Sequence, residues 1–360
     1  MSTIDELFTK YLKSVMPDDK ALQRAIAAHN DLRTDLENDV ELGERIERTL
    51  LSGSYGRDTA IHGIKDVDII VQTNLTKAEI SQDKRTSETE QAYLLRKTRE
   101  AIERTGRVAK TKPARRSIYV ELPKEVNEIG EDLPELTLDI VPVLIPWEKE
   151  QDPMEIADRE LSQWCLTYPN SQLKDSVTRN QNSKKIDGYN SYKSLVKMLK
   201  AWKKVHFGAE KTPKGFVLEC IVSKYHNPNA EHWMDAVEDL FVNICYAWPY
   251  PDMLQSIPQV HDISDINPAL ISIAKTIEEA KRVLEAFHTS LSNIKLAREQ
   301  LPIDLYDAAK TLQLVFGSDE SNDLCFPLPE VDPNKAQSKK EALARIAATI
   351  EKPSKPWYYG

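Results

Sequence analysis

The chain has 360 residues, of which 41% are hydrophobic, and it carries a formal net charge of −9 at pH 7. This length suits two closely packed lobes, and the acidic balance argues against a protein that coats nucleic acid by bulk charge, although a local basic groove stays open. Without a membrane-length apolar stretch or the apolar core of a secretion signal, we expect a cytoplasmic protein with no membrane contact. The cysteines follow no C-x-x-C spacing and are expected to be reduced thiols: Cys165, Cys220, Cys245 and Cys325.

The N-terminal part of the chain is predicted to be helical. Residues 3–15 have an amphipathic pattern, and a longer pattern from about Asp18 to Glu47 repeats its apolar residues near the helical period. Asp18 is a residue type that favours the start of a helix. We therefore expect a short helix followed by a long one.

Residues 52–71 hold the motif around which the rest of the sequence is organised. Gly53 lets a phosphate approach the backbone closely, and the Ser54 hydroxyl with nearby N–H groups can donate hydrogen bonds to it. Further on, Asp66 and Asp68 lie two apart within a β-branched run, so a strand puts both carboxylates on one face. Such a pair suits Mg²⁺ shared with substrate phosphates. Each half of the motif alone is more often a turn or a solvated strand end.

A second strand is predicted over residues 136–144, with a single acid, Asp139, inside apolar sequence. Burying an unpaired acid costs free energy. The position is explained if this strand lies beside the first and Asp139 completes a three-carboxylate metal site. The alternative interpretation is an acid on an edge strand that faces water.

The remaining sequence indicates a mixed sheet flanked by helices. We expect strands over 67–73 and 117–122 and a charged helical segment over 77–107, without the regular crossover helices of a parallel sheet. From Tyr189 onward the pattern is almost wholly helical. Beyond the first helix of this part, helices are expected at 231–246, 268–299, 303–315 and 335–350.

The Gly-Ser pair, the Asp-x-Asp and the later lone Asp together resemble the polymerase-β-type nucleotidyltransferase superfamily. The strings GSYGRDTAIHGIKDVDIIV and LDIVPVL resemble the cGAS/DncV-like nucleotidyltransferases of bacterial anti-phage signalling, and the resemblance runs from about Ile46 to the C-terminus. It implies an α+β fold. Residues 1–150 would form a nucleotidyltransferase lobe with a mixed sheet and an N-terminal spine helix, 151–350 a helical lobe that completes the nucleotide cleft, and 351–360 a flexible tail.

The resemblance implies two-metal nucleotidyl transfer. Asp66 and Asp68 would hold two Mg²⁺ ions, or Mn²⁺, about 3.5–4 Å apart as in such sites. Asp139 would help one ion to activate the attacking ribose hydroxyl and would accept its proton.

The phosphate side of the site is assigned on the same grounds. Gly53 and Ser54 would hold the β- and γ-phosphates. One lysine of the basic helix after Tyr189 would offset charge on the leaving pyrophosphate, and Lys197 fits the family's L-x-K pattern. The segment 214–219 resembles the Ser/Gly-x-x-L-E segment that lines the nucleotide pocket, although a lysine stands where a serine is common.

The implied activity is the synthesis of a cyclic di- or trinucleotide from NTPs, ATP among them, by two successive transfers in one pocket. The product would activate a separate effector protein. Three alternatives stay open: a template-independent RNA nucleotidyltransferase of the CCA-adding or poly(A) type, a linear 2′-5′-oligoadenylate synthase, and an inactive nucleotide sensor. The acidic charge counts against the first, and the intact carboxylates count against the last.

Two surface features bear on partners. Lys112, Arg115 and Arg116 form a basic cluster that is either a solvated face or a grip for a nucleotide or an activating ligand, and a nucleic-acid activator stays open. The chain ends KPSKPWYYG. In some systems with similar enzymes, an E1–E2-like ligase joins the C-terminal residue to a target amine, and Gly360 suits the narrow channel of such a partner. The alternative is that the aromatic residues of the tail pack back onto the body.

Overall fold

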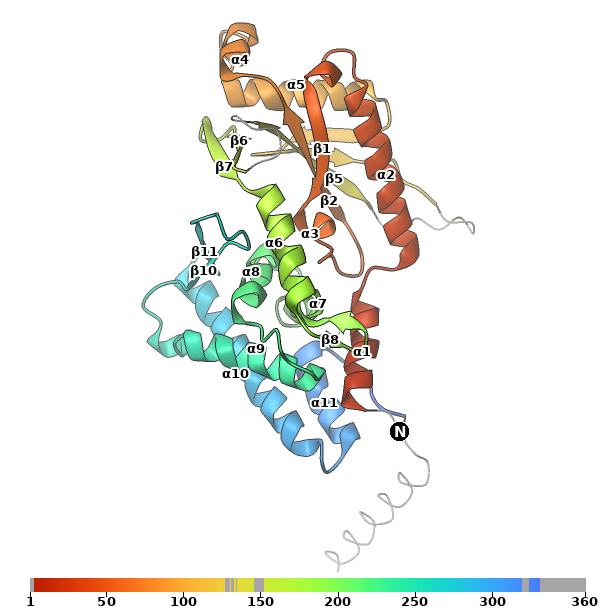
Figure 1. The fold of residues 1–360 in the computed structure, drawn as a ribbon, viewed down its shortest axis with the longest axis vertical. Coiled ribbons are helices and arrows are strands. Elements are labelled where there is room, and N and C mark those ends of the chain that lie inside the picture. The colour runs from red at the N-terminus through yellow and green to blue at the C-terminus, as the bar shows by residue number, and fades with distance from the viewer. Residues whose placement is uncertain are drawn as a thin grey trace, which may run out of the picture.

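The structure is a computed structural model that describes residues 3–126, 130, 133, 135–145, 152–318 and 324–330. Figure 1 shows two lobes, one built on a sheet with helices beside it and one built almost wholly of helices. The predicted helix over 335–350 and the tail over 351–360 lie outside the described residues. Among the helices that are described, none is long and apolar enough to cross a membrane.

The sheet lobe is centred on a seven-stranded sheet whose main path runs β1-β2-β5-β4-β3, with β6 and β7 continuing from β5. The strands are β1 (Ile46–Ser52), β2 (Asp66–Thr73), β3 (Lys110–Pro113), β4 (Ile118–Glu121), β5 (Thr137–Leu144), β6 (Met154–Asp158) and β7 (Gln163–Thr167). β2 and β5 pair in parallel, and the other neighbouring strands pair antiparallel. This confirms the predicted mixed sheet.

The two central strands, β2 and β5, carry acids on otherwise apolar sequence. Most of their β-branched and leucine side chains are buried, which suits a parallel pair that is largely covered on both faces. In the register of this pair Asp68 lies opposite Asp139, and β1 places Ser52 opposite Asp68. The predicted adjacency of the Asp-x-Asp strand and the Asp139 strand is therefore confirmed, and the Gly-Ser turn lies beside the Asp-x-Asp strand.

The helices of the sheet lobe are α2 (Asp19–Glu37), α3 (Gly53–Gly56), α4 (Lys77–Asp83) and α5 (Glu90–Arg104), with a 3₁₀ turn η1 (Gly43–Arg45). Two predictions are corrected here. The helix expected to continue to Glu47 ends at Glu37, because η1 and then β1 occupy the rest of that segment. The segment 77–107 forms two helices instead of one, because Thr76 and Thr89 each cap a separate N-terminus.

The helical lobe has its own apolar core. Its helices are α1 (Ile4–Val15), α6 (Pro169–Asn182), α7 (Ser191–Phe207), α8 (Gly215–Tyr225), α9 (Trp233–Ala247), α10 (Ile277–Gln300) and α11 (Leu305–Phe316). Smaller elements are β8 (Lys185–Ile186), β9 (Tyr189–Asn190), η2 (Pro251–Met253), β10 (Gln259–His261) and β11 (Leu270–Ser272). Trp202 stacks on Phe287 with ring centroids 4.5 Å apart, and both rings are fully buried. Large aromatic rings of this kind supply much of the apolar area that holds a helical core together.

The division of the chain between the lobes differs from the predicted boundary at residue 150. β6 and β7 belong to the sheet, which therefore continues to Thr167. α1 packs its buried face into the core of the helical lobe instead of the sheet lobe. The two N-terminal helices, α1 and α2, are separate as predicted. They end and begin on either side of Pro17, and Figure 1 shows one beside each lobe.

Candidate active site

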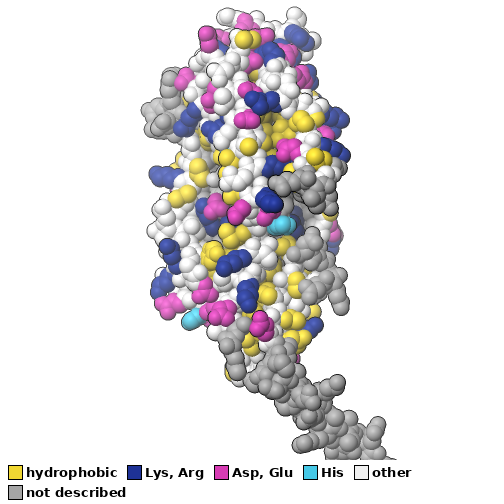
Figure 2. Space-filling model, turned by 90° about the vertical axis from the view of Figure 1, so that its right-hand side faces the viewer, with side chains coloured by type: hydrophobic (Ala, Val, Ile, Leu, Met, Phe, Trp, Pro, Cys, Tyr) yellow, Lys and Arg dark blue, Asp and Glu magenta, His cyan; other side chains and the backbone are white. Residues whose placement is uncertain are grey.

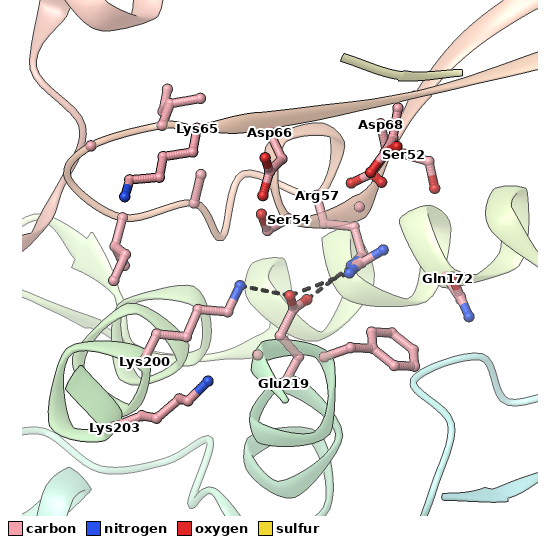
Figure 3. Close-up of a pocket in the computed structure, with 18 of the residues that line it drawn as sticks. Ser52, Ser54, Arg57, Lys65, Asp66, Asp68, Gln172, Lys200, Lys203 and Glu219 are labelled. Carbon is pink, nitrogen blue, oxygen red and sulfur yellow. Dashed lines mark hydrogen bonds and ion pairs between the residues drawn. The ribbon is translucent and has the colours of Figure 1, made fainter. Parts of the chain in front are cut away.

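A cavity of about 750 Å³ opens between the two lobes (Figure 3). β2, β5 and the turn at α3 line one side, and α6, α7 and α8 line the other. Asp66, Asp68, Asp139, Gly53 and Ser54 all line it. The structure thus brings together five of the six site residues predicted from the sequence.

The three aspartates are oriented by neighbouring hydroxyl groups. Thr137 Oγ1 donates to Asp66 Oδ1 at 2.7 Å, and Ser117 Oγ donates to Asp139 Oδ1 at 3.1 Å. Thr137 begins β5 and Ser117 directly precedes β4, and sequence reasoning missed both residues. The polar residue directly before an apolar strand is a weak signal, and only the strand order shows what it contacts.

The carboxylates stand close enough to disturb one another's protonation. Burial raises the pKa of Asp68 to about 6, with the negative charges of Asp139 and Asp66 adding to the effect. Burial also raises the pKa of Asp139, against the hydrogen bond from Ser117. Carboxylates in this situation are stabilised in the charged form by a nearby cation.

The donor set fits a hard divalent cation that completes its shell with substrate oxygens. Mg²⁺ is usually held by one or two carboxylates plus phosphate and water. Across the described ranges, no three His, Cys, Asp or Glu side chains are already gathered to hold a metal ion.

Gly53 is required by the position of Asp68. Its φ of +61° lies in the left-handed region, and an added Cβ would fall 1.7 Å from Asp68 Oδ2. A side chain at this position would therefore occupy the space of the carboxylate itself. The glycine predicted to let a phosphate approach has a second use here, because the Asp68 carboxylate approaches its backbone directly.

Opposite the aspartates, three charged side chains form a buried ion triad: Arg57, Glu219 and Lys200 (Figure 3). Arg57 donates to Glu219 from Nε at 2.8 Å and from Nη2 at 3.2 Å, and Lys200 Nζ donates to Glu219 Oε1 at 2.7 Å. All three side chains are buried and line the cavity. Burial alone raises the pKa of Glu219, but the adjacent Lys200 and Arg57 charges outweigh it and the pKa is lowered. The triad carries a net positive charge toward the cavity.

Sequence reasoning found this triad only in part. Glu219 lies in the segment that resembles the family's pocket-lining pattern, within the apolar run Val217–Val222. A lone acid in apolar sequence is the signal that pointed to Asp139, and it applies equally here. Arg57 gave no such signal, because it lies in a polar turn.

The nucleotide-binding assignment of Lys197 stays a prediction, and the structure favours its neighbours further along α7 for this use. Its Nζ lies 3.0 Å from Asp58 Oδ1, and it is absent from the cavity lining, whereas Lys200, Lys203 and Lys204 line the cavity. Lys193, Lys197, Lys200 and Lys204 recur at helical spacing and form one stripe of α7. The N-terminal half of the stripe contacts Asp58, and only its C-terminal half reaches the cavity.

The other basic positions raised by the sequence have structural partners or lie elsewhere. Arg115 and Arg116 both pair with Asp158, which is fully buried. Neither arginine lines the cavity. Lys214 precedes α8 and does not line it either, although the following Gly215 does. The basic cluster thus anchors the β6–β7 end of the sheet.

The fold and the site together define a two-lobed nucleotidyltransferase-like protein. The sequence profile of the Second Messenger Oligonucleotide or Dinucleotide Synthetase (SMODS) domain matches residues 1–180, half of the chain. The chain belongs to this family of second messenger synthetases.

Individual relatives agree with the family assignment. A cyclic AMP-AMP-AMP synthase of Acinetobacter sp. (strain ATCC 27244 / 9458) is 30% identical over 248 residues, which are 67% of this chain and 62% of the relative. The chain thus matches less than two thirds of that relative's length.

Solved structures of bacterial cGAS/DncV-like enzymes share the fold. E. coli MS115-1 CdnC, solved with ATP, superposes with a TM-score of 0.64 at 16% identity, over 87% of this chain and 98% of that one. Bradyrhizobium diazoefficiens CdnG, solved with GTP, gives a TM-score of 0.64 at 14% identity, over 88% and 95% of the two chains.

Proposed function

We propose that this protein is a cyclic oligonucleotide synthase that joins NTPs, ATP among them, into a cyclic di- or trinucleotide. The observation that carries the proposal is the parallel register that sets Asp68 beside Asp139, across a cavity from a net positive ion triad. This arrangement suits the transfer of a nucleotidyl group with pyrophosphate as the leaving group. The SMODS match to residues 1–180 supports the same class of reaction.

The three aspartates would hold Mg²⁺, or Mn²⁺ in its place. When bound, such ions neutralise phosphate charge and lower the pKa of an attacking hydroxyl. Gly53 leaves the space into which the Asp68 carboxylate projects. Asp139 accepts a hydrogen bond at Oδ1, and its Oδ2 makes none within the described ranges, so Oδ2 is suited to take the ribose hydroxyl proton.

The opposite wall would bind the triphosphate. Arg57 and Lys200 are held in place before any substrate arrives, because Glu219 binds both. Preorganised cations of this kind stabilise charge on a leaving pyrophosphate without reorganisation. Lys203 and Lys204, one turn on along α7, extend the positive lining of the cavity.

Of the alternatives, the RNA nucleotidyltransferase is disfavoured by the family match and by the net charge of −9. Figure 2 shows one face of the protein on which Lys and Arg are mixed with Asp and Glu, without one extended basic patch. Binding to a nucleic-acid backbone depends on such a patch. A linear oligoadenylate synthase shares the site and is separated only by its product.

The deciding experiment is incubation of the full chain with all four NTPs and Mg²⁺ or Mn²⁺, followed by phosphatase treatment and mass spectrometry. A phosphatase-resistant oligonucleotide of two or three residues is expected. Products that phosphatase shortens would favour a linear synthase, extension of labelled tRNA would favour the RNA enzyme, and absence of pyrophosphate release would favour a sensor.

The cellular setting follows the same proposal. The product would act on a separate effector protein in anti-phage defence, in the cytoplasm.

An E1–E2-like ligase would attach Gly360, which lies outside the described residues, to a target amine. Co-expression with such a ligase is expected to give higher-mass conjugates of the wild type and none of the Gly360→Glu protein, and conjugates that persist in that variant would exclude the tail.

A further inference from the structure

The lining of the cavity has a basic part and a largely apolar part. Lysines of α7 form the basic part, and Ile70, Val141 and Ile156 form the apolar part together with the polar Gln172 of α6. Ile70 and Val141 come two residues after Asp68 and Asp139 on β2 and β5, so they lie on the same face of the sheet as those aspartates. An apolar shelf beside the reacting groups suits the flat ring of a nucleobase.

Gln172 is held in one orientation by Asp262. Its Nε2 donates to Asp262 Oδ1 at 3.1 Å and to Oδ2 at 3.0 Å. Asp262 is buried, and its Oδ1 also accepts the Ser264 N–H at 2.8 Å. Because a carboxylate only accepts hydrogen bonds, the amide nitrogen of Gln172 must face Asp262. In Figure 3 this nitrogen points away from the aspartates.

The other amide atom of Gln172 is therefore a fixed acceptor. In the described part of the chain, no group donates to its Oε1, and this atom is not among the buried atoms without a partner. Oε1 is therefore not fully buried, and Gln172 is one of the residues that line the cavity, so this atom is available to a ligand there. A fixed acceptor attracts an exocyclic amine and repels a carbonyl oxygen at the same place.

We propose that Gln172 selects the nucleobase, with Asp262 as its positioning residue, so that the site prefers adenine over guanine and cytosine over uracil. The inference rests on the proposed function, since it takes the cavity to be the nucleotide site. Adenine and cytosine present an amino group where guanine and uracil present a carbonyl oxygen. The amino group donates to Gln172 Oε1, whereas the carbonyl oxygen would face it unpaired.

A purely structural use of Gln172 would be to tie α6 to the loop after β10. That tie is already made by other groups. Arg179 Nη1 donates to the Ile263 carbonyl at 2.9 Å, and the Asp265 N–H donates to Asp175 Oδ2 at 2.9 Å. The Gln172–Asp262 contact is thus not needed to hold the helix against that loop.

The test measures binding, not turnover, by titrating the full chain in Mg²⁺ with α,β-methylene analogues of ATP, ITP, GTP, CTP and UTP. Wild type is expected to bind the ATP analogue about tenfold more tightly than the ITP and GTP analogues, and the CTP analogue more tightly than the UTP analogue. ITP isolates the effect because it replaces the adenine amine by a carbonyl without adding the 2-amino group of guanine.

Two variants separate selection from structure. Gln172→Met keeps the length of the side chain and removes both polar atoms, so the ATP to ITP affinity ratio is expected to approach one. In Asp262→Asn the side-chain oxygen stays on the Ser264 N–H and the new NH₂ faces Gln172, so the Gln172 amide turns and the ratio is expected to fall below one. Gln259→Met, an exposed glutamine on β10, is the matched control and should keep the wild-type ratio.

The outcomes are distinct. Equal loss of affinity for all five analogues in Gln172→Met, with an unchanged ratio, would assign the residue a structural use and overturn the selection proposal. Wild type that binds all five equally well would overturn it while leaving the proposed function standing. Absence of binding by every analogue would instead overturn the proposed function together with this inference.

Discussion

The two sides of the cavity handle charge in opposite ways. On the sheet side, Asp66 and Asp139 accept hydrogen bonds from hydroxyl groups, and Asp68 is held against its neighbours with a raised pKa. On the opposite side, Glu219 satisfies both cations of the buried ion triad. The sheet side thus has negative charge that makes no ion pair among the residues that the structure describes, whereas each charge of the triad already has a partner in the protein, with one net positive charge left toward the cavity. Substitutions on the first side should remove activity and spare stability, and substitutions in the triad should reduce stability.

The largest effect is expected on the sheet side. Replacing Asp66 and Asp68 together by asparagine should reduce pyrophosphate release by at least about a thousandfold, because the metal ions lose their main ligands. The free energy of unfolding in EDTA should not fall, because two acids that repel each other have been removed. The matched control is Asp31→Asn with Asp35→Asn, a pair that contacts Arg107 on the surface. Turnover that survives in the active-site variant would contradict the two-metal assignment.

The ion triad is tested by Glu219→Gln, which keeps the shape of the side chain and removes its charge. The free energy of unfolding is expected to fall by about 3–5 kcal/mol, because two buried cations lose their counter-charge. Urea unfolding measures the change, and Glu231→Gln, which removes an exposed partner of Lys184, should leave the midpoint unchanged. A Glu219 variant as stable as the wild type would mean that the Glu219 charge does not stabilise Arg57 and Lys200 in the folded protein.

The pH dependence of stability tests the difference between the sheet-side aspartates and the buried ion triad. The pKa of Asp68 is about 6 in the folded protein, above the value of about 3.9 for an unfolded aspartate, so protonation favours the folded state. Without metal, this group should cost up to roughly 3 kcal/mol of stability as pH rises from about 4 to 6, with partial exposure reducing the effect.

Asp68→Asn is the variant that isolates this titration. In EDTA its advantage in urea midpoint over the wild type should be small at pH 4 and should grow up to about pH 6. An advantage that is the same at both pH values would contradict the raised pKa. Added Mg²⁺ with an NTP analogue should raise the urea midpoint of the wild type and so remove the advantage of the variant.

Gly53→Ala tests how closely the backbone at Gly53 is packed against the Asp68 carboxylate. The added Cβ would fall 1.7 Å from Asp68 Oδ2, so the carboxylate must move, and turnover is expected to fall by about a hundredfold. Gly106→Ala is the matched control, since its φ is +67° and an added Cβ would meet nothing within 4 Å. Backbone strain without the clash should leave turnover unchanged, and equal losses in both variants would show that strain alone is responsible.

The smallest effect is expected at Lys197. Lys197→Met should change the KM for ATP by less than about twofold, because its partner Asp58 is exposed and the ion pair is largely screened. Lys200→Met removes a cation that lines the cavity and should raise that KM by about tenfold. A larger rise at Lys197 than at Lys200 would support the assignment made from the sequence pattern.

Much of the sheet side could be predicted because strand geometry is local. The two-residue period sets Asp66 and Asp68 on one face, and Asp139 in apolar sequence indicated a partner strand, which the parallel register of β2 and β5 confirms. The mixed sheet and the helical second lobe followed from the same periodicities. The boundary at residue 150 failed because β6 and β7 are short and partly polar, so nothing local assigns them to the sheet.

What only the tertiary structure decided lies on the helical side. Periodicity places Lys193, Lys197, Lys200 and Lys204 on one stripe, but which of them meets the cavity depends on how α7 docks against residues 57–62. The partners of Glu219 and Gln172 are likewise remote: Arg57 lies 162 residues from Glu219, and Asp262 lies 90 residues from Gln172. Local sequence fixes the direction of a side chain relative to its own helix or strand, whereas the group it meets is set by the packing of whole elements against one another.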